Sequence, residues 1–424
     1  MNMEKNLFSS VRFRQILNDL KRRPEDAARE LNISLSKIKK ILNDKENINL
    51  NIATKIMKIW PIQIGSLINH NFSSKRSPDL KIFTKEKSIK TSRIIKRNGN
   101  DYYEYRDTAM EKFAPFRPEW IRTICKVSNN NPNNKKIIWN KGHLLHQFTY
   151  FVGNINFYYI DSNNKKKVSV MKTGDSMYIS PYIPHSFASR DNNLNFIIAL
   201  TYLDKVTPQL QDDLSRIGEK NIKKILINTT NPTKQKNSLK NRYSDNLLLN
   251  KTEFKNRIKT SKNNNSLKKI SDALGINCRD LLGFDNNNKV SIKKNLKMKR
   301  WFFPEDKKFF YLRELASSKF VSEAKSLEIE VLRENNFNIE SFCHQYAYVL
   351  SDKLKIKKGR KIYNLKKHDT FYLKPFTKFS LISKKSKVII LRIPGIISGD
   401  NLLQLSQVGK KNIGRVINEN KRWY

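Results

Sequence analysis

The feature that most constrains this chain is an internal duplication, because the same short motifs return in the same order in its two halves. Two copies are too few to stack as a solenoid, so we expect the halves to pack against each other as a pseudo-dimer. Downstream of these motifs, SRIGEKNIKKI from residue 215 is echoed by SQVGKKNIGRV from residue 406. The matched pairs are His146-Gln147 with His344-Gln345, Gly174-Asp175 with His368-Asp369, and Pro181 with Pro375.

Each half begins with short amphipathic helices. In PEDAARELNISLSKIKKILND, Pro24 suits a helix start, Asn32 suits the turn, and Ser34 or Ser36 can cap the next helix. Apolar residues recur at helical spacing on both sides of that turn, which is a helix-turn-helix pattern. The pattern returns at SLKKISDALGINCRDLLGFD in the second half.

Each half then continues with strands. Runs such as FTYFVGNINFYYI and KVSVM are separated by the polar turn DSNNKK, and HDTFYLKPFTKFSL repeats the pattern in the second half. Short apolar and aromatic runs between turn residues indicate antiparallel strands. The predicted fold class is α+β, mainly β, with two tandem repeats of a helix-turn-helix-like region followed by a β-barrel. The expected ranges are 1–75 and 206–295 (helical), 90–205 and 296–398 (barrels), and 399–424 (helical tail).

Charge and cysteine content narrow the class of protein. The net charge of +45 would suit nucleic acid or an anionic surface, but the lysines are spread along the whole chain. We therefore attribute the charge to a lysine- and asparagine-rich composition that can also attract an anionic substrate. The chain has no run of about 18 apolar residues, so no membrane span is predicted. The start of the chain also lacks the apolar centre of a secretory signal. Three scattered cysteines without a CxxC pair favour reduced thiols in the cytoplasm.

A metal site is predicted in the first half. His143 and Gln147 are four residues apart, so on one strand they would share a face, while His146 would point the other way. His185 follows two prolines and can approach from a later strand. Two imidazoles with open positions suit ferrous iron and O2 chemistry, and a glutamine can coordinate only through its carbonyl oxygen. An alternative remains open, in which a local strand distortion makes His146 the second histidine ligand.

These spacings resemble the two motifs of cupin barrels, which are double-stranded β-helices. The first motif is Gly142-His143, three residues and Gln147, and the second runs from Gly174-Asp175 through Pro181 to His185. In cupins the first motif ends with a glutamate ligand, where this chain has Gln147. A helix-turn-helix region joined to a cupin and duplicated in a chain of this size resembles the phosphonate oxygenase family, which contains hydroxyethylphosphonate dioxygenase and methylphosphonate synthase.

The resemblance separates the two branches of that family. The dioxygenase is known for a glutamate ligand six residues before the last histidine, and that position here is Ile179. The synthase is known for a glutamine on the first motif strand, which Gln147 matches. The resemblance therefore implies His143, Gln147 and His185 as catalytic iron ligands. In the second half Ser341 replaces the first histidine and Phe379 the last, which predicts one iron per chain and a degenerate second barrel.

The family also implies substrate-binding residues, and a purely structural role is an alternative for each of them. Arg97 and Tyr105 stand eight residues apart, as a phosphonate-binding arginine and tyrosine do in the family, but they could be a surface residue and a core aromatic. Asn140 precedes His143 by three residues and could simply shape the turn. Lys21 resembles a lysine that the helical region contributes to the pocket, but a lysine at a helix end also complements the helix dipole.

The function implied by the resemblance is an Fe(II)- and O2-dependent cleavage of 2-hydroxyethylphosphonate to methylphosphonate and CO2. The substrate would supply the electrons, so no 2-oxoglutarate is expected, and the family implies a homo-oligomer. One alternative is the dioxygenase outcome, hydroxymethylphosphonate and formate. Another is a DNA-binding regulator that joins the helix-turn-helix to a cupin sensor. Against the regulator, the expected recognition helix SLSKIKKILNDK has no arginine for bidentate base contacts, so nucleic acid is not an expected partner.

Overall fold

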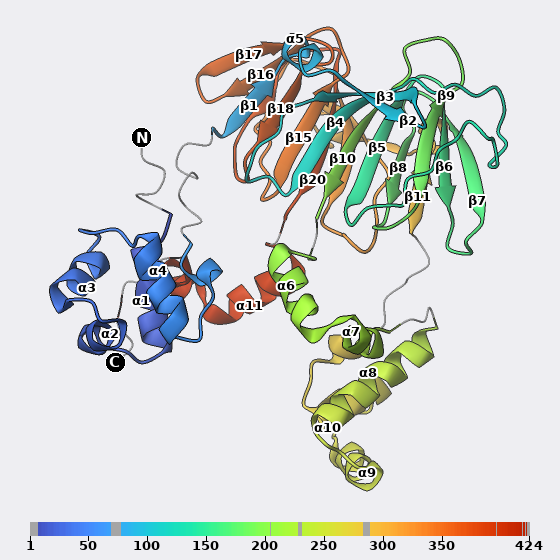
Figure 1. Cartoon of the computed structure of the whole chain (residues 1–424). Coiled ribbons are helices and arrows are strands. Elements are labelled where there is room, and N and C mark those ends of the chain that lie inside the picture. The colour runs from blue at the N-terminus through green and yellow to red at the C-terminus, as the bar shows by residue number, and fades with distance from the viewer. Residues whose placement is uncertain are drawn as a thin grey trace. The chain divides into compact units, whose positions relative to one another are not determined.

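The chain forms two compact units in the computed structural model, each described by itself (Figure 1). The first unit contains residues 1–79 and 397–424, and the second contains residues 80–396. No helix in the described part of the chain is long and apolar enough to cross a membrane. The structure describes residues 7–68, 78–203, 205–227, 231–282, 289–395, 397–417, 419 and 421.

The first unit is helical and confirms the local pattern predicted around residue 32. Pro24 starts one helix, Asn32 adopts the left-handed conformation (φ 48°), and the Ser34 side chain caps the next helix. Apolar faces of the four N-terminal helices meet in one core. The helices of this unit are α1 (Ser10–Asp19), α2 (Pro24–Leu31), α3 (Leu35–Leu42), α4 (Leu50–Ile59), η2 (Ile64–Ser66), α11 (Gly399–Val408), η6 (Lys410–Asn412) and α12 (Ile413–Ile417).

The second unit is mainly β. Two large sheets have seven described strands each, and the order of strands is equivalent in both halves. One sheet is ordered β11 (Val290–Lys293), β8 (Ser176–Ile179), β5 (His146–Val152), β10 (Phe196–Tyr202), β4 (Phe116–Thr123), β3 (Asn100–Asp107) and β2 (Arg93–Arg97). The other is ordered β1 (Leu80–Phe83), β18 (Thr370–Leu373), β15 (His344–Val349), β20 (Ser386–Ile393), β14 (Lys325–Val331), β13 (Phe310–Glu314) and β12 (Arg300–Phe303).

Each large sheet shares an apolar core with a small three-stranded sheet of the same half. The closed barrels predicted from the sequence are not confirmed, because the hydrogen-bonded ladders of the described residues end at β2 and β12 and the small sheets pair among themselves. The small sheets are β7 (Lys166–Met171), β6 (Ile155–Ile160) and β9 (His185–Ser189), and β17 (Lys361–Leu365), β16 (Leu354–Lys358) and β19 (Ser380–Leu381).

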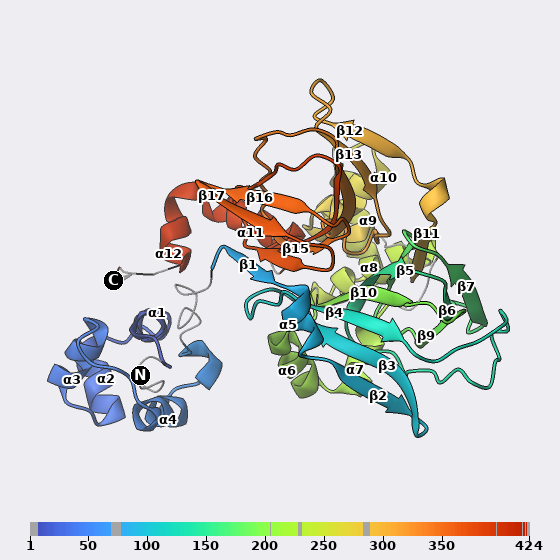
Figure 2. The same cartoon turned by 90° about the horizontal axis from the view of Figure 1, so that it is seen from above.

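The two halves exchange one strand each. Strand β1 precedes the first-half strands in sequence but pairs with β18 of the second half, and β11 of the second half pairs with β8 of the first. Figures 1 and 2 both show the blue β1 beside the orange strands of the second half. The predicted helical range 206–295 therefore includes a strand, β11. Four half-buried residues leave no alternation of polar and apolar positions by which to detect it.

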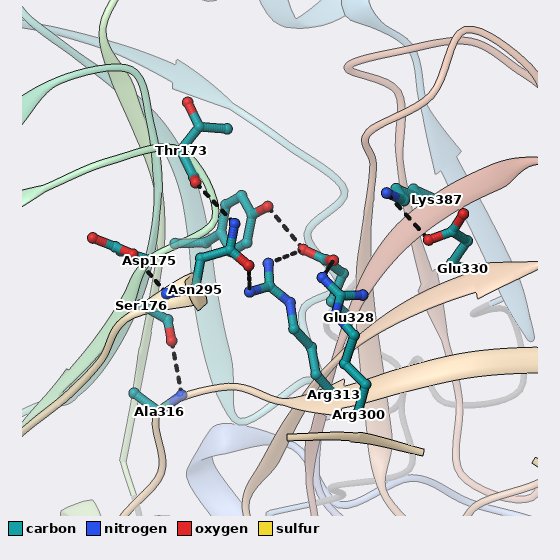
Figure 3. A network of polar contacts seen from close by, with 11 residues as sticks. Thr173, Asp175, Ser176, Asn295, Arg300, Arg313, Ala316, Glu328, Glu330 and Lys387 are labelled. Carbon is teal, nitrogen blue, oxygen red and sulfur yellow. Dashed lines mark hydrogen bonds and ion pairs between the residues drawn. The ribbon is translucent and has the colours of Figure 1, made fainter. Parts of the chain in front are cut away.

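The duplicated motif around Asp175 and Asp369 anchors these exchanged strands. The Asp175 carboxylate accepts the backbone N–H of Asn295, just after β11, at 2.8 Å, and the Asp369 carboxylate accepts that of Lys85, just after β1, at 2.8 Å. The next residue of each motif accepts a backbone N–H from the opposite half. These pairs are Ser176 with Ala316 (2.9 Å, Figure 3) and Thr370 with Ala109 (2.8 Å).

The facing sides of the two large sheets form one shared core rich in aromatic rings. His146 and His344 lie in equivalent places at this interface. Nδ1 of His146 is hydrogen-bonded to the Tyr178 hydroxyl at 2.6 Å, and Nδ1 of His344 to the Tyr372 hydroxyl at 2.7 Å. Burial lowers the pKa of both histidines to about 4, so both are neutral near pH 7. The expected pseudo-dimeric packing of the halves is therefore present.

The second helical segment connects the halves and has a small core of its own. Its first two helices meet at Gly218 (φ 83°), and α11 in the first unit is followed by Gly409 (φ 78°), so the echoed sequences form similar helix–glycine–helix corners. The helices of the second unit are α5 (Lys85–Ile89), α6 (Pro208–Ile217), α7 (Glu219–Ile225), α8 (Pro232–Asn246), α9 (Lys251–Thr260), α10 (Ser266–Leu274), η4 (Cys278–Leu281) and η5 (Asn295–Lys297).

Removal of the Asp175 carboxylate should destabilise the second unit. In Asp175→Ala, the backbone N–H groups of Lys172 and Asn295 lose their acceptor, and Lys294 loses its ion-pair partner. We expect the free energy of unfolding to fall by about 2–4 kcal/mol, measured by urea denaturation. Asp161→Ala is the matched control, because Asp161 accepts two backbone N–H groups within a single turn. An equal loss in both variants would contradict the anchoring role.

The interface histidines should make stability depend on pH. Their pKa is about 4 in the folded chain and about 6.5 when unfolded, so the unfolded chain binds more protons between these values. The free energy of unfolding is therefore highest above pH 6.5 and decreases as the pH falls toward 4. We expect His146→Gln/His344→Gln to reduce this loss by on the order of 2 kcal/mol per histidine, measured as the urea midpoint from pH 7.5 to 4.5. The prediction is wrong if the urea midpoint of the double variant falls with pH as steeply as that of the unchanged protein.

Candidate metal centre

Gln147 lies on β5 with its side chain on the interior face of the first half. It is 4% exposed, and its amide nitrogen donates to Thr149 Oγ1 at 2.9 Å. Thr149 is fully buried and stands two residues along the same strand, so both side chains share a face. This hydrogen bond fixes the amide orientation and turns the carbonyl oxygen, Oε1, toward His143.

His143 reaches this point by a different route from the one predicted. The strand begins at His146, so His143 lies in the preceding loop and not on the strand with Gln147. Gly142 allows this loop, because it has φ 73° and a Cβ there would lie 2.5 Å from the backbone carbon of Tyr182. The Tyr182 N–H then donates to the His143 carbonyl at 2.7 Å. The glycine-histidine pair is therefore explained by a close backbone contact.

His185 is the first residue of β9 and is 5% exposed. Its ring lies 5.3 Å from the ring of His143, measured between centroids. Burial lowers the pKa of His185 to about 4, so the ring is neutral near pH 7. Nδ1 of His185 lies 2.8 Å from the carbonyl of Ile183, and Nδ1 of His143 lies 2.9 Å from that of Leu145. An Nδ1–H donated to each carbonyl leaves Nε2 unprotonated, which is the form that binds metal.

Two of the candidate donor atoms, on His143 and Gln147, are spaced as neighbouring ligands of a first-row metal ion would be. Nε2 of His143 lies 3.1 Å from Oε1 of Gln147. A neutral imidazole has one N–H, so with Nδ1 protonated these two atoms are both acceptors. Two acceptors held face to face favour a cation beside them. Metal–ligand bonds of roughly 2.1 Å at right angles place two donor atoms about 3 Å apart. No group of three His, Cys, Asp or Glu side chains in the described ranges could hold a metal, so such a site needs the glutamine.

Asn140 supports the loop from within. Its Oδ1 accepts the backbone N–H of His185 at 2.8 Å and that of Gly142 at 3.0 Å, so one side chain ties the loop to β9. Its Nδ2 lies 3.0 Å from Nε2 of His185. Asn140 is therefore beside the candidate ligands, with its amide nitrogen toward them.

Arg97 and Tyr105 are brought to the same side of the first half. Arg97 lies over the rings of Tyr102 and Tyr103 at 4.8 and 4.9 Å and contacts Ser186, the residue after His185, at 3.5 Å. The Tyr105 ring is edge-on to Tyr103 at 6.0 Å, and its hydroxyl makes no hydrogen bond in the described part of the chain. The Arg97 guanidinium thus lies beside the strand that carries His185, and the Tyr105 hydroxyl lies on the neighbouring strand β3.

Two other predicted residues have different outcomes. Lys21 belongs to the first unit, where its ammonium donates to the carbonyl of Asn18 at 3.0 Å, so its role in a pocket stays a prediction. His146 faces the interface between the large sheets, on the opposite side of β5 from Gln147. The alternative with His146 as the second histidine ligand requires a local strand distortion, and none is seen, because the strand is regular at this point and pairs continuously with β10.

The second half shows what happens to the equivalent place without histidines. The backbone contact from Tyr182 to His143 is repeated from Phe376 to Ser341 at 2.7 Å, so Ser341 occupies the histidine position. Phe379 stands in place of His185. The oxygen of Gln345 accepts the guanidinium Nε of Arg392 at 3.0 Å. A half-buried positive charge on this oxygen opposes binding of a cation.

Sequence reasoning missed Thr149 and Arg392. Thr149 could have been found by its two-residue spacing from Gln147, since period two places both on one face. Arg392 could not, because its contact with Gln345 depends on the pairing of β15 with β20.

Known proteins were compared with the chain, and no family model matches it. Methylphosphonate synthase of Nitrosopumilus maritimus (strain SCM1) is 40% identical over 440 aligned positions, which cover 98% of this chain and 95% of that protein. The (S)-2-hydroxypropylphosphonic acid epoxidase of Streptomyces wedmorensis is 30% identical over 94 residues, which are 22% of this chain and 44% of the epoxidase.

A solved structure matches over almost the whole length. It is the Streptomyces albus hydroxyethylphosphonate dioxygenase with 2-hydroxyethylphosphonate and Fe(II) bound, with a TM-score of 0.87, 29% identity and 98% coverage of both chains. The sequence identity extends over nearly the full length of the synthase, and the dioxygenase has the same fold. Together these similarities establish the family of this chain. The chain belongs to the family of methylphosphonate synthase and hydroxyethylphosphonate dioxygenase.

Proposed function

We propose that this protein is a mononuclear non-haem Fe(II) oxygenase that uses O2 to cleave the C–C bond of 2-hydroxyethylphosphonate, giving methylphosphonate, CO2 and water. The observation that carries the proposal is the orientation of Gln147, whose carbonyl oxygen faces Nε2 of His143 while Thr149 holds its amide nitrogen. The full-length similarity to methylphosphonate synthase and to an Fe(II)-binding dioxygenase supports the same conclusion.

His143, Gln147 and His185 would hold the iron, which supplies activation of O2 when bound. All three ligands are neutral, so the protein leaves the two positive charges of the ion uncompensated. A dianionic phosphonate is therefore favoured as a chelating ligand over a neutral one. Substrate atoms and O2 account for every product atom and electron, so no 2-oxoglutarate is needed.

The neighbouring residues would bind and position the phosphonate. The Arg97 guanidinium can pair with phosphonate oxygens, and the Tyr105 hydroxyl is available to donate. Asn140 would both orient His185 and present its amide nitrogen. Lys21 would contribute from the helical unit. Fixing the substrate with several donors supplies proximity and excludes water from the reacting carbon.

The remaining parts of the proposal concern the rest of the molecule. We assign both halves to the cupin fold, with the second half degenerate and structural, because Arg392 already occupies the oxygen of Gln345. We place the protein in the cytoplasm as a homo-oligomer whose partner is a small phosphonate and not nucleic acid. Unpaired Cys125, Cys278 and Cys343 are consistent with a reducing compartment.

Gln147→Ala should abolish iron binding and turnover. Loss of one of three protein ligands should reduce Fe(II) retained per chain at least about tenfold after anaerobic reconstitution and desalting, measured by a ferrozine assay. Gln345→Ala is the matched control, because it removes the same residue type from the equivalent position of the second half. Its iron content should stay at about one per chain. Full occupancy in Gln147→Ala would overturn the ligand assignment.

The product distinguishes the two branches of the family. We expect phosphorus NMR of the Fe(II) enzyme with 2-hydroxyethylphosphonate and O2 to show methylphosphonate as the main product, because Ile179 offers no carboxylate. Isotope-labelled substrate should release labelled CO2 from the hydroxymethyl carbon. Hydroxymethylphosphonate with equimolar formate would instead assign the dioxygenase reaction to this chain.

A further inference from the structure

A cavity of about 290 Å³ lies between the two large sheets, on the opposite side of β5 from Gln147. This volume is near the lower end for small-molecule sites, and the walls come from both halves of the chain. Figure 3 shows Arg300, Arg313, Glu328 and Lys387 of this cavity from close by. The cavity is lined by Tyr150, Val152, Thr173, Gly174, Phe196, Asn295, Arg300, Arg313, Glu328, Tyr348, Leu350, Lys367, His368 and Lys387.

The buried carboxylate in this cavity is already satisfied. Glu328 is 3% exposed and accepts from the guanidinium of Arg313, from Arg300 at 3.3 Å and from the Tyr150 hydroxyl at 3.0 Å. Arg313 is 1% exposed, and its Nε has no hydrogen-bond partner in the described structure. A buried N–H without an acceptor is destabilising, and Arg313, a cationic residue of the cavity wall, has such an unsatisfied donor.

The other cations have spare binding capacity. Lys367 lies on the exposed rim and forms no ion pair in the described ranges. Lys387 pairs with Glu330 at 3.2 Å but is 43% exposed, so two of its three N–H groups can serve another acceptor. Four cationic side chains and one carboxylate line the cavity, which therefore favours an anion.

His368 occupies a costly backbone conformation at the cavity wall. It has φ 75°, where the equivalent residue of the first half is Gly174 with φ 91°. The left-handed conformation is unfavourable for a non-glycine residue, and such residues cluster at functional sites. The Tyr348 hydroxyl lies 2.5 Å from Nδ1 of His368, so the side chain of His368 is held by a hydrogen bond at the cavity wall. His368 thus places a polar side chain at a position where the first half has a glycine.

The equivalent place in the first half does not form a charged cavity of this size. Strand registers make Arg106 the counterpart of Arg313 and Trp120 the counterpart of Glu328. Arg106 stacks on the Trp120 ring at 4.1 Å and binds Glu104, and the cavity beside them measures only about 70 Å³. The charged cavity is therefore not a simple by-product of packing two similar sheets.

We propose that the cavity walled by Arg300, Arg313, Lys367 and Lys387 is a second ligand site, which binds a small tetrahedral oxyanion of the phosphate or phosphonate type. Such an anion has enough acceptors to satisfy a guanidinium and two ammonium groups together. The aromatic walls supplied by Tyr150 and Tyr348 limit the ligand to a small one. This inference does not depend on the proposed reaction, because the site stands apart from the candidate metal ligands.

The test is isothermal titration calorimetry of the metal-free full-length chain at low ionic strength. Inorganic phosphate and methylphosphonate are titrated separately, and the tighter of the two identifies the source of the anion. We expect a dissociation constant below about 1 mM for at least one of them. Lys367→Gln/Lys387→Gln should weaken it at least about tenfold, since both residues are exposed enough to be replaced without unfolding. Arg300→Gln, checked by urea denaturation, should act in the same direction.

Two further variants distinguish binding in this cavity from binding elsewhere on the protein. Arg216→Gln/Lys378→Gln removes two positive charges at exposed positions outside the cavity and should leave the affinity unchanged. Arg97→Gln affects the candidate metal centre and should also leave it unchanged. The proposal is overturned if neither anion binds, if the charge control weakens binding equally, or if Arg97→Gln removes binding that the double lysine variant retains.

Discussion

The exchange of strands β1 and β11 is the constraint on which the rest of the second unit depends. Each large sheet is completed by a strand from the opposite half, and each incoming strand is fixed by a buried aspartate, Asp175 or Asp369. Strand β8 lies between β5, which carries Gln147, and the incoming β11. The sheet behind the candidate metal centre is therefore complete only when the second half is folded. The second half thus supports the site although it lacks counterparts of the two candidate histidine ligands.

Strand β5 serves two purposes through its alternation. Even-numbered positions such as His146 and Tyr150 face the interface between sheets, whereas Gln147 and Thr149 face the interior. A shift of one residue in register would exchange these sets and place the ligand amide in an aromatic core. The histidine–tyrosine hydrogen bond at the interface opposes such a shift, because it fits only when His146 lies beside Tyr178. Packing of the halves and geometry of the site are thus fixed by the same strand.

Much of this arrangement could be predicted from the sequence. The duplication identified the paired Asp175 and Asp369 turns, and parity correctly placed His146 away from Gln147. Three kinds of feature could not be predicted. The exchanged strands lack periodicity and take their partners from the other half. His143 reaches Gln147 through a loop whose course depends on backbone contact with Tyr182. The open sheets, where closed barrels were expected, depend on which strands hydrogen-bond to one another across long stretches of sequence, and no local pattern records that.

The register of β5 and β8 also explains how ligands can differ between related sites. Gln147 and Ile179 are directly opposite each other on neighbouring strands, with both side chains buried on the interior face. Such positions have Cβ atoms about 5 Å apart, so a side chain from either one can reach the same ion. A ligand can therefore move between strands while the two histidines stay in place. In this chain the apolar Ile179 offers no donor atom, so the proposed iron would take the neutral amide of Gln147 as its third protein donor, and its charge would be balanced by what binds to it.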